Sequence, residues 1–432
     1  MSTVRMKKSG VMGFFRYFSS VTISNGKTLK LGKAHEIGNG GNDGGQLKAR
    51  ILKVVNPRRS AQAVLQKWVD GGGGWVSISE LRSISKMLLN RRRFKHALEI
   101  LTWMEANDRY KISSADHAMR LELTIKVHSL REAEEYFEGL PNSVARKAAC
   151  LPLLYFYVKE RSIEKAEALM LKMNRWGFLV NPHPFNAMMK LYIATSQPKK
   201  VLSVIQQMKE NQISRNVLSY NLWMNASAEL SGVGSSEMIY KEMLRDESVV
   251  VGWSSLCTLA NIYQKYGLVE KVFWALREAE KKLSTCNRLG YLFLLTMYAS
   301  LNDADEVLRL WKLCKQVPGR ITCANYMCIL SCMVKLGDIK EAEHLFLEWE
   351  SQCRTYDIRV SNILLGAYMR NGLTKKAESL HVRSLSKGGH PNYKTWEILM
   401  EGWVRNHDMD KAVDAMRNAF SVIDNCEVET IG

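Results

Sequence analysis

A period of about 35 residues runs through most of the chain and constrains its fold more than any other feature. Ten units in register can be aligned, and they span residues 78–113, 114–146, 147–181, 182–216, 217–252, 253–287, 288–322, 323–357, 358–392 and 393–427. A fixed period of this length is typical of stacked repeats, in which each unit buries its apolar face against its neighbours.

Two columns of the alignment predict the structure of each unit. The twentieth residue is small in every unit: Ala97, Ala133, Ala166, Val201, Ser236, Val272, Val307, Ala342, Ala377 and Ala412. The twenty-fourth is mostly bulky: Leu101, Phe137, Met170, Ile205, Tyr240, Leu276, Trp311, Phe346 and Met416. Because these positions lie one helical turn apart, they indicate the buried face of a second helix that packs closely on the first.

The eleventh residue and the turn between the helices complete the pattern. The eleventh residue is tyrosine in half of the units, and we expect it to anchor the first helix: Tyr157, Tyr192, Tyr263, Tyr298 and Tyr368. We expect Gly267, Gly337 and Gly372 to end first helices in the left-handed conformation. The sequence therefore predicts an all-α fold, a solenoid of about ten helix-turn-helix repeats.

The first 35 residues have the composition of an organelle transit peptide, with seven Lys or Arg, eight Ser or Thr and no acidic residue. Val11, Phe14 and Phe18 fall at helical spacing, and Arg16-Tyr17-Phe18-Ser19 resembles a mitochondrial cleavage signal. We predict a mitochondrial transit peptide over residues 1–18, with residue 35 as its outer limit, and a mature protein in the matrix. The alternatives are a plastid address and a basic start with no address.

Short segments flank the repeats. Residues 36–77 are expected to hold a Gly-rich linker, which includes 38–45, and one leading helix over 58–69. Gly71–Gly74 is read as a loop, because the G-K-S/T sequence of a phosphate-binding loop does not follow it. Residues 428–432 are expected to form a tail.

Charge and composition limit the partners. The formal net charge is +18, and removing residues 1–18 would leave +14, which favours a polyanionic partner. No apolar stretch approaches the roughly 20 residues that cross a bilayer, so no membrane insertion is expected. The nine cysteines include no C-x-x-C pair, and Cys323, Cys328 and Cys332 are expected to be buried apolar residues rather than ligands. We expect no cofactor or metal.

The alignment columns resemble those of the pentatricopeptide repeat family, most clearly in Val217–Asn225, Val334–Glu343 and Ile358–Glu378. The competing tetratricopeptide family would place Trp early in the first helix, Gly at the eighth residue and Pro at the end, and this chain lacks that pattern. The resemblance covers the whole array. It implies a right-handed α-solenoid in an organellar, mostly plant, protein that binds single-stranded RNA with one base per repeat.

The resemblance also implies candidate base-contacting residues, since in the family the fifth and last residues of a repeat contact the base edge. Carried over, the pairs are Asn186 with Asn216, Asn221 with Gly252, Met327 with Asp357, and Asn362 with Asn392, and the terminal Asn181 and Asn287 stand without a polar fifth residue. The alternative role of these asparagines is to cap helix N-termini. At the second residue, where the family has valine, only Leu218 and Leu289 supply a comparable apolar side chain.

The thirteenth residue supplies candidate phosphate contacts. It is basic in six units: Lys126, Lys159, Lys265, Lys335, Arg370 and Arg405. Stacked at a fixed rise, these cations would form a stripe suited to phosphates. The alternative is that they are exposed cations that interact with the helix dipole.

Nothing in the sequence indicates catalysis. The H-x-E and P-C-x-x-C strings of deaminase-like extensions do not occur, and the array ends five residues before Gly432. We therefore expect a monomeric, non-enzymatic protein that binds single-stranded organellar RNA in transcript stabilisation, processing or translation. Mitochondrial RNA-processing or ribosomal proteins are candidate further partners. The alternative is a protein-interaction scaffold or a structural component associated with the mitochondrial ribosome.

Overall fold

The computed structural model describes residues 43–54, 56, 59–72 and 76–431, so the predicted transit peptide lies outside the described residues. All regular elements in this part of the chain are helices, and the fold is all-α as predicted. The chain forms two compact units. The first comprises residues up to Asp116 together with Leu123–Ala133, and the second comprises His117–Glu122 together with the chain from Glu134 onward.

Helices alternate along the chain as two series. The first helices of the repeats are α4 (Ile78–Asn90), α6 (Ser114–Val127), α8 (Ser143–Lys159), α10 (Pro182–Ala194), α12 (Val217–Ser231), α14 (Trp253–Lys265), α16 (Arg288–Ser300), α18 (Cys323–Leu336), α20 (Ile358–Arg370) and α22 (Tyr393–Arg405). The second helices are α5 (Phe94–Glu105), α7 (Leu130–Glu138), α9 (Ile163–Arg175), α11 (Pro198–Glu210), α13 (Val233–Arg245), α15 (Val269–Lys281), α17 (Ala304–Gln316), α19 (Ile339–Gln352), α21 (Thr374–Ser386) and α23 (Met409–Ile431).

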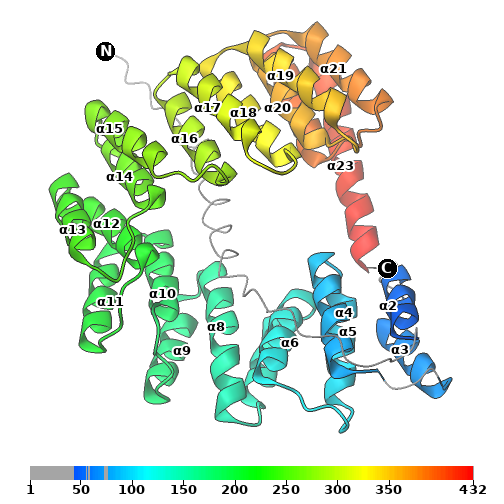
Figure 1. The fold of residues 1–432 in the computed structure, drawn as a ribbon. Coiled ribbons are helices and arrows are strands. Elements are labelled where there is room, and N and C mark those ends of the chain that lie inside the picture. The colour runs from blue at the N-terminus through cyan, green and yellow to red at the C-terminus, as the bar shows by residue number, and fades with distance from the viewer. Residues whose placement is uncertain (1–42, 55, 57–58, 73–75, 432) are drawn as a thin grey trace. The chain divides into compact units, whose positions relative to one another are not determined.

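Within the second unit the helices stack as in an α-solenoid. Successive first helices pack on one another from α8 through α22, and each second helix packs on the first helix of its own repeat. Figure 1 shows this alternation, for example in α10 to α15. The stack therefore presents two rows, one of first helices and one of second helices.

The small column explains why the two helices of a repeat approach closely. All ten residues of this column are buried, among them Ala166, Val201 and Ala342 with no exposed surface. Ser236 is the polar member, and its hydroxyl is satisfied because it donates to the Met224 carbonyl oxygen at 2.9 Å. Gly267, Gly337 and Gly372 have φ angles of 74°, 81° and 70°, which confirms the predicted left-handed ends of first helices.

Burial in the other columns mostly follows the prediction. Cys328 and Cys332 are buried, whereas Cys323 at the start of α18 is half-buried. In the twenty-fourth column most residues are buried, but Met416 in α23 is 42% exposed. The prediction of a buried face was wrong for this residue, because α22 is the last first helix among the described residues and no further repeat covers α23.

Three boundaries differ from those expected. Helix α2 (Asp43–Lys53) begins inside the segment predicted as linker, and α3 (Ala61–Asp70) is the leading helix. Helix α8 begins at Ser143 rather than at Lys147, because the Asn142 side chain caps it by accepting from the Ala145 amide at 2.8 Å. Helix α23 continues to Ile431, through the predicted tail.

Candidate nucleic-acid interface

The polar residues that end each unit lie at the N-termini of first helices. Side-chain oxygens of Asn181, Asn216, Asn287, Asp357 and Asn392 each accept from a backbone amide of the helix that follows. These residues are therefore N-caps, as the alternative interpretation expected. Capping occupies an oxygen, so the amide nitrogen of an asparagine cap stays available to a ligand.

The fourth and fifth units join two of the predicted base-contacting residues directly. The amide of Asn186 on α10 donates to the Asn216 Oδ1 atom at 3.1 Å. The hydroxyl of Ser219 on α12 donates to the Asn186 Oδ1 atom at 2.8 Å. Asn186 is only 2% exposed and Ser219 is fully buried. The two asparagines thus form a fixed pair, with the orientation of both amides set by their hydrogen bonds.

The ninth and tenth units repeat this pair with one difference. The amide of Asn362 on α20 donates to the Asn392 Oδ1 atom at 3.3 Å. The hydroxyl of Thr395 donates to the same Asn392 oxygen at 3.1 Å rather than to Asn362. Among the described residues, the buried Oδ1 atom of Asn362 therefore has no hydrogen-bond donor. A buried acceptor of this kind favours a ligand that brings a donor.

The other predicted pairs are not joined. Asn221 has Gly252 as its partner in the pattern, and its buried Oδ1 atom has no donor among the described residues. Asp357 forms an ion pair with Arg359 at 2.7 Å instead of a contact with the half-buried Met327. Asn181 and Asn287 act as caps. Direct hydrogen bonds between the fifth and last residues are therefore found in two of these repeats.

The predicted phosphate-contacting cations occupy one position in the fold, the last turn of a first helix. Lys126, Lys159, Lys265, Lys335, Arg370 and Arg405 are all exposed and all lie in such a turn. Five of them, all but Lys126, belong to the second unit. They are well placed to interact with the helix dipole, and the same location leaves their charges facing solvent.

Few carboxylates neutralise this row. In the described part of the chain, Lys265, Lys335 and Arg370 have no carboxylate within ion-pair distance. Lys159 lies 3.8 Å from Glu160, and Arg405 lies 3.6 Å from Glu401.

Two cations of this row, Arg370 and Lys335, have lowered pKa values. Desolvation lowers the pKa of Arg370, and the nearby Arg405 lowers it further. Desolvation also lowers the pKa of Lys335. Arg370 therefore lies close enough to Arg405 for repulsion, which a bound polyanion would offset.

On the second helices, several cations bond to carboxylates of the preceding repeat. A glutamate on one second helix accepts from a tyrosine hydroxyl and a lysine ammonium of the next repeat, all within 3.1 Å: Glu134 with Tyr157 and Lys165, Glu167 with Tyr192 and Lys200, Glu237 with Tyr263 and Lys271, and Glu343 with Tyr368 and Lys376.

Sequence reasoning missed this network and one further pair. The tyrosines had been recognised as anchors, but not their glutamate acceptors, although these glutamates recur at the twenty-first residue of the alignment. Arg82, the fifth residue of the first unit, is held by Asp116 through Nε at 3.0 Å and the terminal nitrogen at 2.6 Å. These bonds outweigh desolvation and lower the pKa of Asp116. Arg82 is therefore committed to a structural ion pair.

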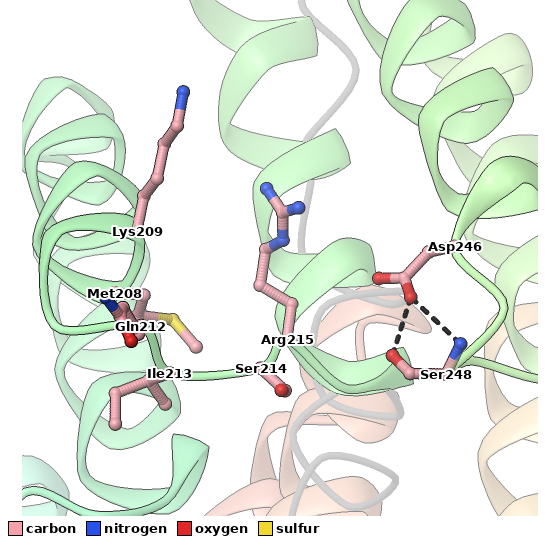
Figure 2. Close-up of a pocket in the computed structure, with 8 residues that line it drawn as sticks. All are labelled: Met208, Lys209, Gln212, Ile213, Ser214, Arg215, Asp246 and Ser248. Carbon is pink, nitrogen blue, oxygen red and sulfur yellow. Dashed lines mark hydrogen bonds between the residues drawn. The ribbon is translucent and has the colours of Figure 1, made fainter.

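A pocket of about 220 Å³ lies away from these rows, between the end of α11 and the loop after α13 (Figure 2). Two of its three charged residues are already bonded. Arg215 pairs with Glu242 at 3.0 Å, and Asp246 accepts from the Ser248 amide at 3.0 Å and hydroxyl at 2.6 Å. Figure 2 shows the Asp246 carboxylate turned toward Ser248. The remaining charged residue, Lys209, has no ion-pair partner among the described residues.

The described residues lack both a metal-binding cluster and a membrane-spanning helix. They contain no group of three or more His, Cys, Asp or Glu side chains arranged to hold a metal ion. None of their helices combines the length and apolarity that a membrane span requires.

Sequence comparisons relate the chain to one family. A model described as pentatricopeptide repeat domain matches residues 168–229, and one described as PPR repeat matches residues 325–353 and 360–389. The pentatricopeptide repeat-containing protein At5g27460 of Arabidopsis thaliana is 56% identical over 380 residues, which cover 87% of this chain and 77% of that protein. The protein At2g20710, mitochondrial, of the same plant is 32% identical over 377 residues, 87% of this chain and 76% of that protein.

A solved structure shares the fold. The crystal structure of the pentatricopeptide repeat protein PPR10 in complex with an 18-nt psaJ RNA element superposes with a TM-score of 0.55 at 18% identity. The similarity covers 88% of this chain and 55% of the PPR10 chain, so this chain spans about half of that protein.

Proposed function

The chain belongs to the pentatricopeptide repeat family, and from three cations that lack carboxylate partners on its first helices we propose that it binds single-stranded RNA along these helices. One observation carries the proposal: Lys265, Lys335 and Arg370 lie in the last turn of the first helices of the sixth, eighth and ninth repeats, and none has a carboxylate partner among the described residues. Cations at one position per repeat match a polyanion whose charges recur along its length. The RNA-bound PPR10 structure, which shares the fold, supports the same choice of ligand.

We assign the two joined asparagine pairs to base contacts. Asn216 and Asn392 each have a side-chain nitrogen that bonds to no described residue, and Asn362 adds a buried acceptor without a donor. Amide groups offer both donors and acceptors to base edges. The remaining repeats would mainly position the RNA through its backbone.

The proposed role is non-catalytic and mitochondrial. Bound along an RNA, a repeat array can block an exonuclease or keep a hairpin open without any chemistry, and this serves transcript stabilisation, processing or translation. Several relatives carry the word mitochondrial in their names, which agrees with the basic, acid-free first 35 residues.

Binding assays with the purified chain test the proposal. A fluorescent pool of single-stranded RNA oligomers with random sequence should bind, and duplex RNA of the same length should compete poorly, because only unpaired bases expose their edges to side chains. Equal binding of duplex and single strand, or no binding of either, would contradict the proposal. Anisotropy at physiological salt is the measurement.

A further inference from the structure

The solvent-exposed face of α13, α15 and α17 carries a second set of cations without ion pairs. Lys241, Arg277 and Lys312 are each the twenty-fifth residue of their unit, and all three are exposed. None lies within ion-pair distance of a carboxylate among the described residues. We name these three residues the outer row.

The three helices are neighbours in the stack. Glu237 of α13 accepts from the Lys271 ammonium of α15 at 2.7 Å, and Glu280 of α15 pairs with Arg309 of α17 at 2.7 Å. The outer row therefore follows three consecutive repeats within the second unit. Figure 1 shows α13, α15 and α17 in succession.

Elsewhere this column is cationic only at Arg417, which pairs with Asp414 at 3.3 Å. In the second repeat its member is Glu138, which pairs with Lys172 of α9 at 2.8 Å. Around the outer row the carboxylates are already engaged, since Glu278 pairs with Lys281 and Glu306 pairs with Arg309. Among the described repeats, only α13, α15 and α17 thus carry three successive cations without ion pairs in this column.

Apolar side chains accompany two of these cations. Met238 is 67% exposed and Trp274 is 48% exposed, and each lies three residues before Lys241 or Arg277 on the same helix face. Single exposed hydrophobic residues are ordinary on protein surfaces. A methionine and a tryptophan in register on adjacent repeats, each beside an unpaired cation, mark an interaction surface.

We propose that the outer row, with Met238 and Trp274, is a docking surface for an acidic amphipathic helix of a partner protein. Packed helices lie about 8–10 Å apart, and seven residues of an α-helix rise about 10.5 Å. Carboxylates seven residues apart on a helix laid across α13, α15 and α17 would therefore meet Lys241, Arg277 and Lys312 in turn. Apolar residues three or four positions after each carboxylate would cover Met238 and Trp274. A phosphate backbone would use the cations but leave the aliphatic Met238 unmatched.

The test uses a fluorescent synthetic peptide about 21 residues long, with Glu at every seventh residue and Leu three residues later, which spans three repeats of about 10 Å each. Its control has the same composition with the Glu and Leu positions shuffled. Full-length chain should bind the first peptide and not the shuffled one. In the variant K241E/R277E/K312E, peptide affinity should fall at least about tenfold, since attraction becomes repulsion. Circular dichroism and the unfolding temperature check that this variant folds.

A reciprocal pair of measurements keeps this surface distinct from the RNA proposal. The outer-row variant should retain its affinity for single-stranded RNA, whereas replacing Lys335, Arg370 and Arg405 by glutamate should abolish RNA binding and leave peptide binding intact. Three results would overturn the inference. These are no binding of the patterned peptide, equal binding of both peptides, and loss of RNA rather than peptide binding in the outer-row variant.

Discussion

Ala342 lies where α19 approaches α18, and none of its surface is exposed. Replacing it with phenylalanine should destabilise the protein by roughly 1–3 kcal/mol, because a larger side chain can be accommodated only if the two helices move apart. Chemical denaturation followed by circular dichroism measures the change. On the same helix His344 is exposed, so H344F adds comparable bulk without a clash and should leave the midpoint nearly unchanged. Equal midpoints for A342F and the unmodified chain would mean that this column is not the helix–helix contact.

At the scale of single residues, the sequence predicts which positions are buried or form turns better than it predicts hydrogen-bond partners. The small column and the left-handed glycines follow from periodicity alone, and both are found in the structure. Asn186 and Asn362 occupy equivalent positions and were predicted to be equivalent. Ser219 completes the hydrogen bonds of Asn186, whereas Thr395 does not reach the Asn362 oxygen. The Ser219 hydroxyl lies within hydrogen-bond distance of both asparagine oxygens, whereas the Thr395 hydroxyl reaches only that of Asn392. The repeat pattern does not specify this side-chain geometry.

Between elements, a cluster of Tyr368, Glu343 and Lys376 ties α20 and α21 to α19. Burial alone would raise the pKa of Glu343, but the hydrogen bonds from Lys376 and Tyr368 outweigh it and lower the pKa below its usual 4.5. A carboxyl with a lowered pKa stabilises the fold above its unfolded-state pKa, and this contribution is lost as the pH falls through the folded-state value.

The substitution E343Q should therefore lower the free energy of unfolding by about 0.5–1 kcal/mol at pH 7. The effect is modest because the ion pair is partly exposed. The difference between E343Q and the unmodified chain should shrink as the pH is lowered below about 4, when the native carboxyl takes up its proton. Urea denaturation at a series of pH values measures it. Glu229 is exposed and has no partner among the described residues, so E229Q is the control and should show neither effect. A deficit in E343Q that stays constant down to acid pH would exclude the charged interaction as its cause.

Element boundaries show where periodicity stops being informative. Unit starts coincide with helix starts except at α8, where capping by Asn142 extends the helix by one turn before Lys147. Helix α2 lies outside the repeat pattern, and the glycines around its start masked it. Each glutamate-tyrosine-lysine cluster joins residues of two successive repeats. A pattern defined within one repeat therefore does not predict it.

For the molecule as a whole, targeting to an organelle is a separate question from the fold. Residues 1–35 joined to a fluorescent reporter should direct it to mitochondria, because the segment is basic, free of acid and amphipathic. Changing Arg5, Lys7, Lys8 and Arg16 to glutamine should abolish import, and processed reporter should begin near Ser19 or Ser20. A reporter that stays in the cytosol, or one that enters plastids, would contradict the mitochondrial assignment.

The most direct test of the central claim is the salt dependence of RNA binding. Each neutralised phosphate contributes about −0.7 to the slope of log affinity against log salt for a single strand, so the K335A/R370A/R405A variant should have a slope shallower by about two. Affinity should fall for all RNA sequences alike, because backbone contacts carry no sequence information. The K241A/R277A/K312A variant removes the same charge from the outer row and should keep the original slope. If the first variant keeps both the affinity and the slope of the unmodified chain, or if the two variants behave alike, the first helices do not form the RNA-binding surface.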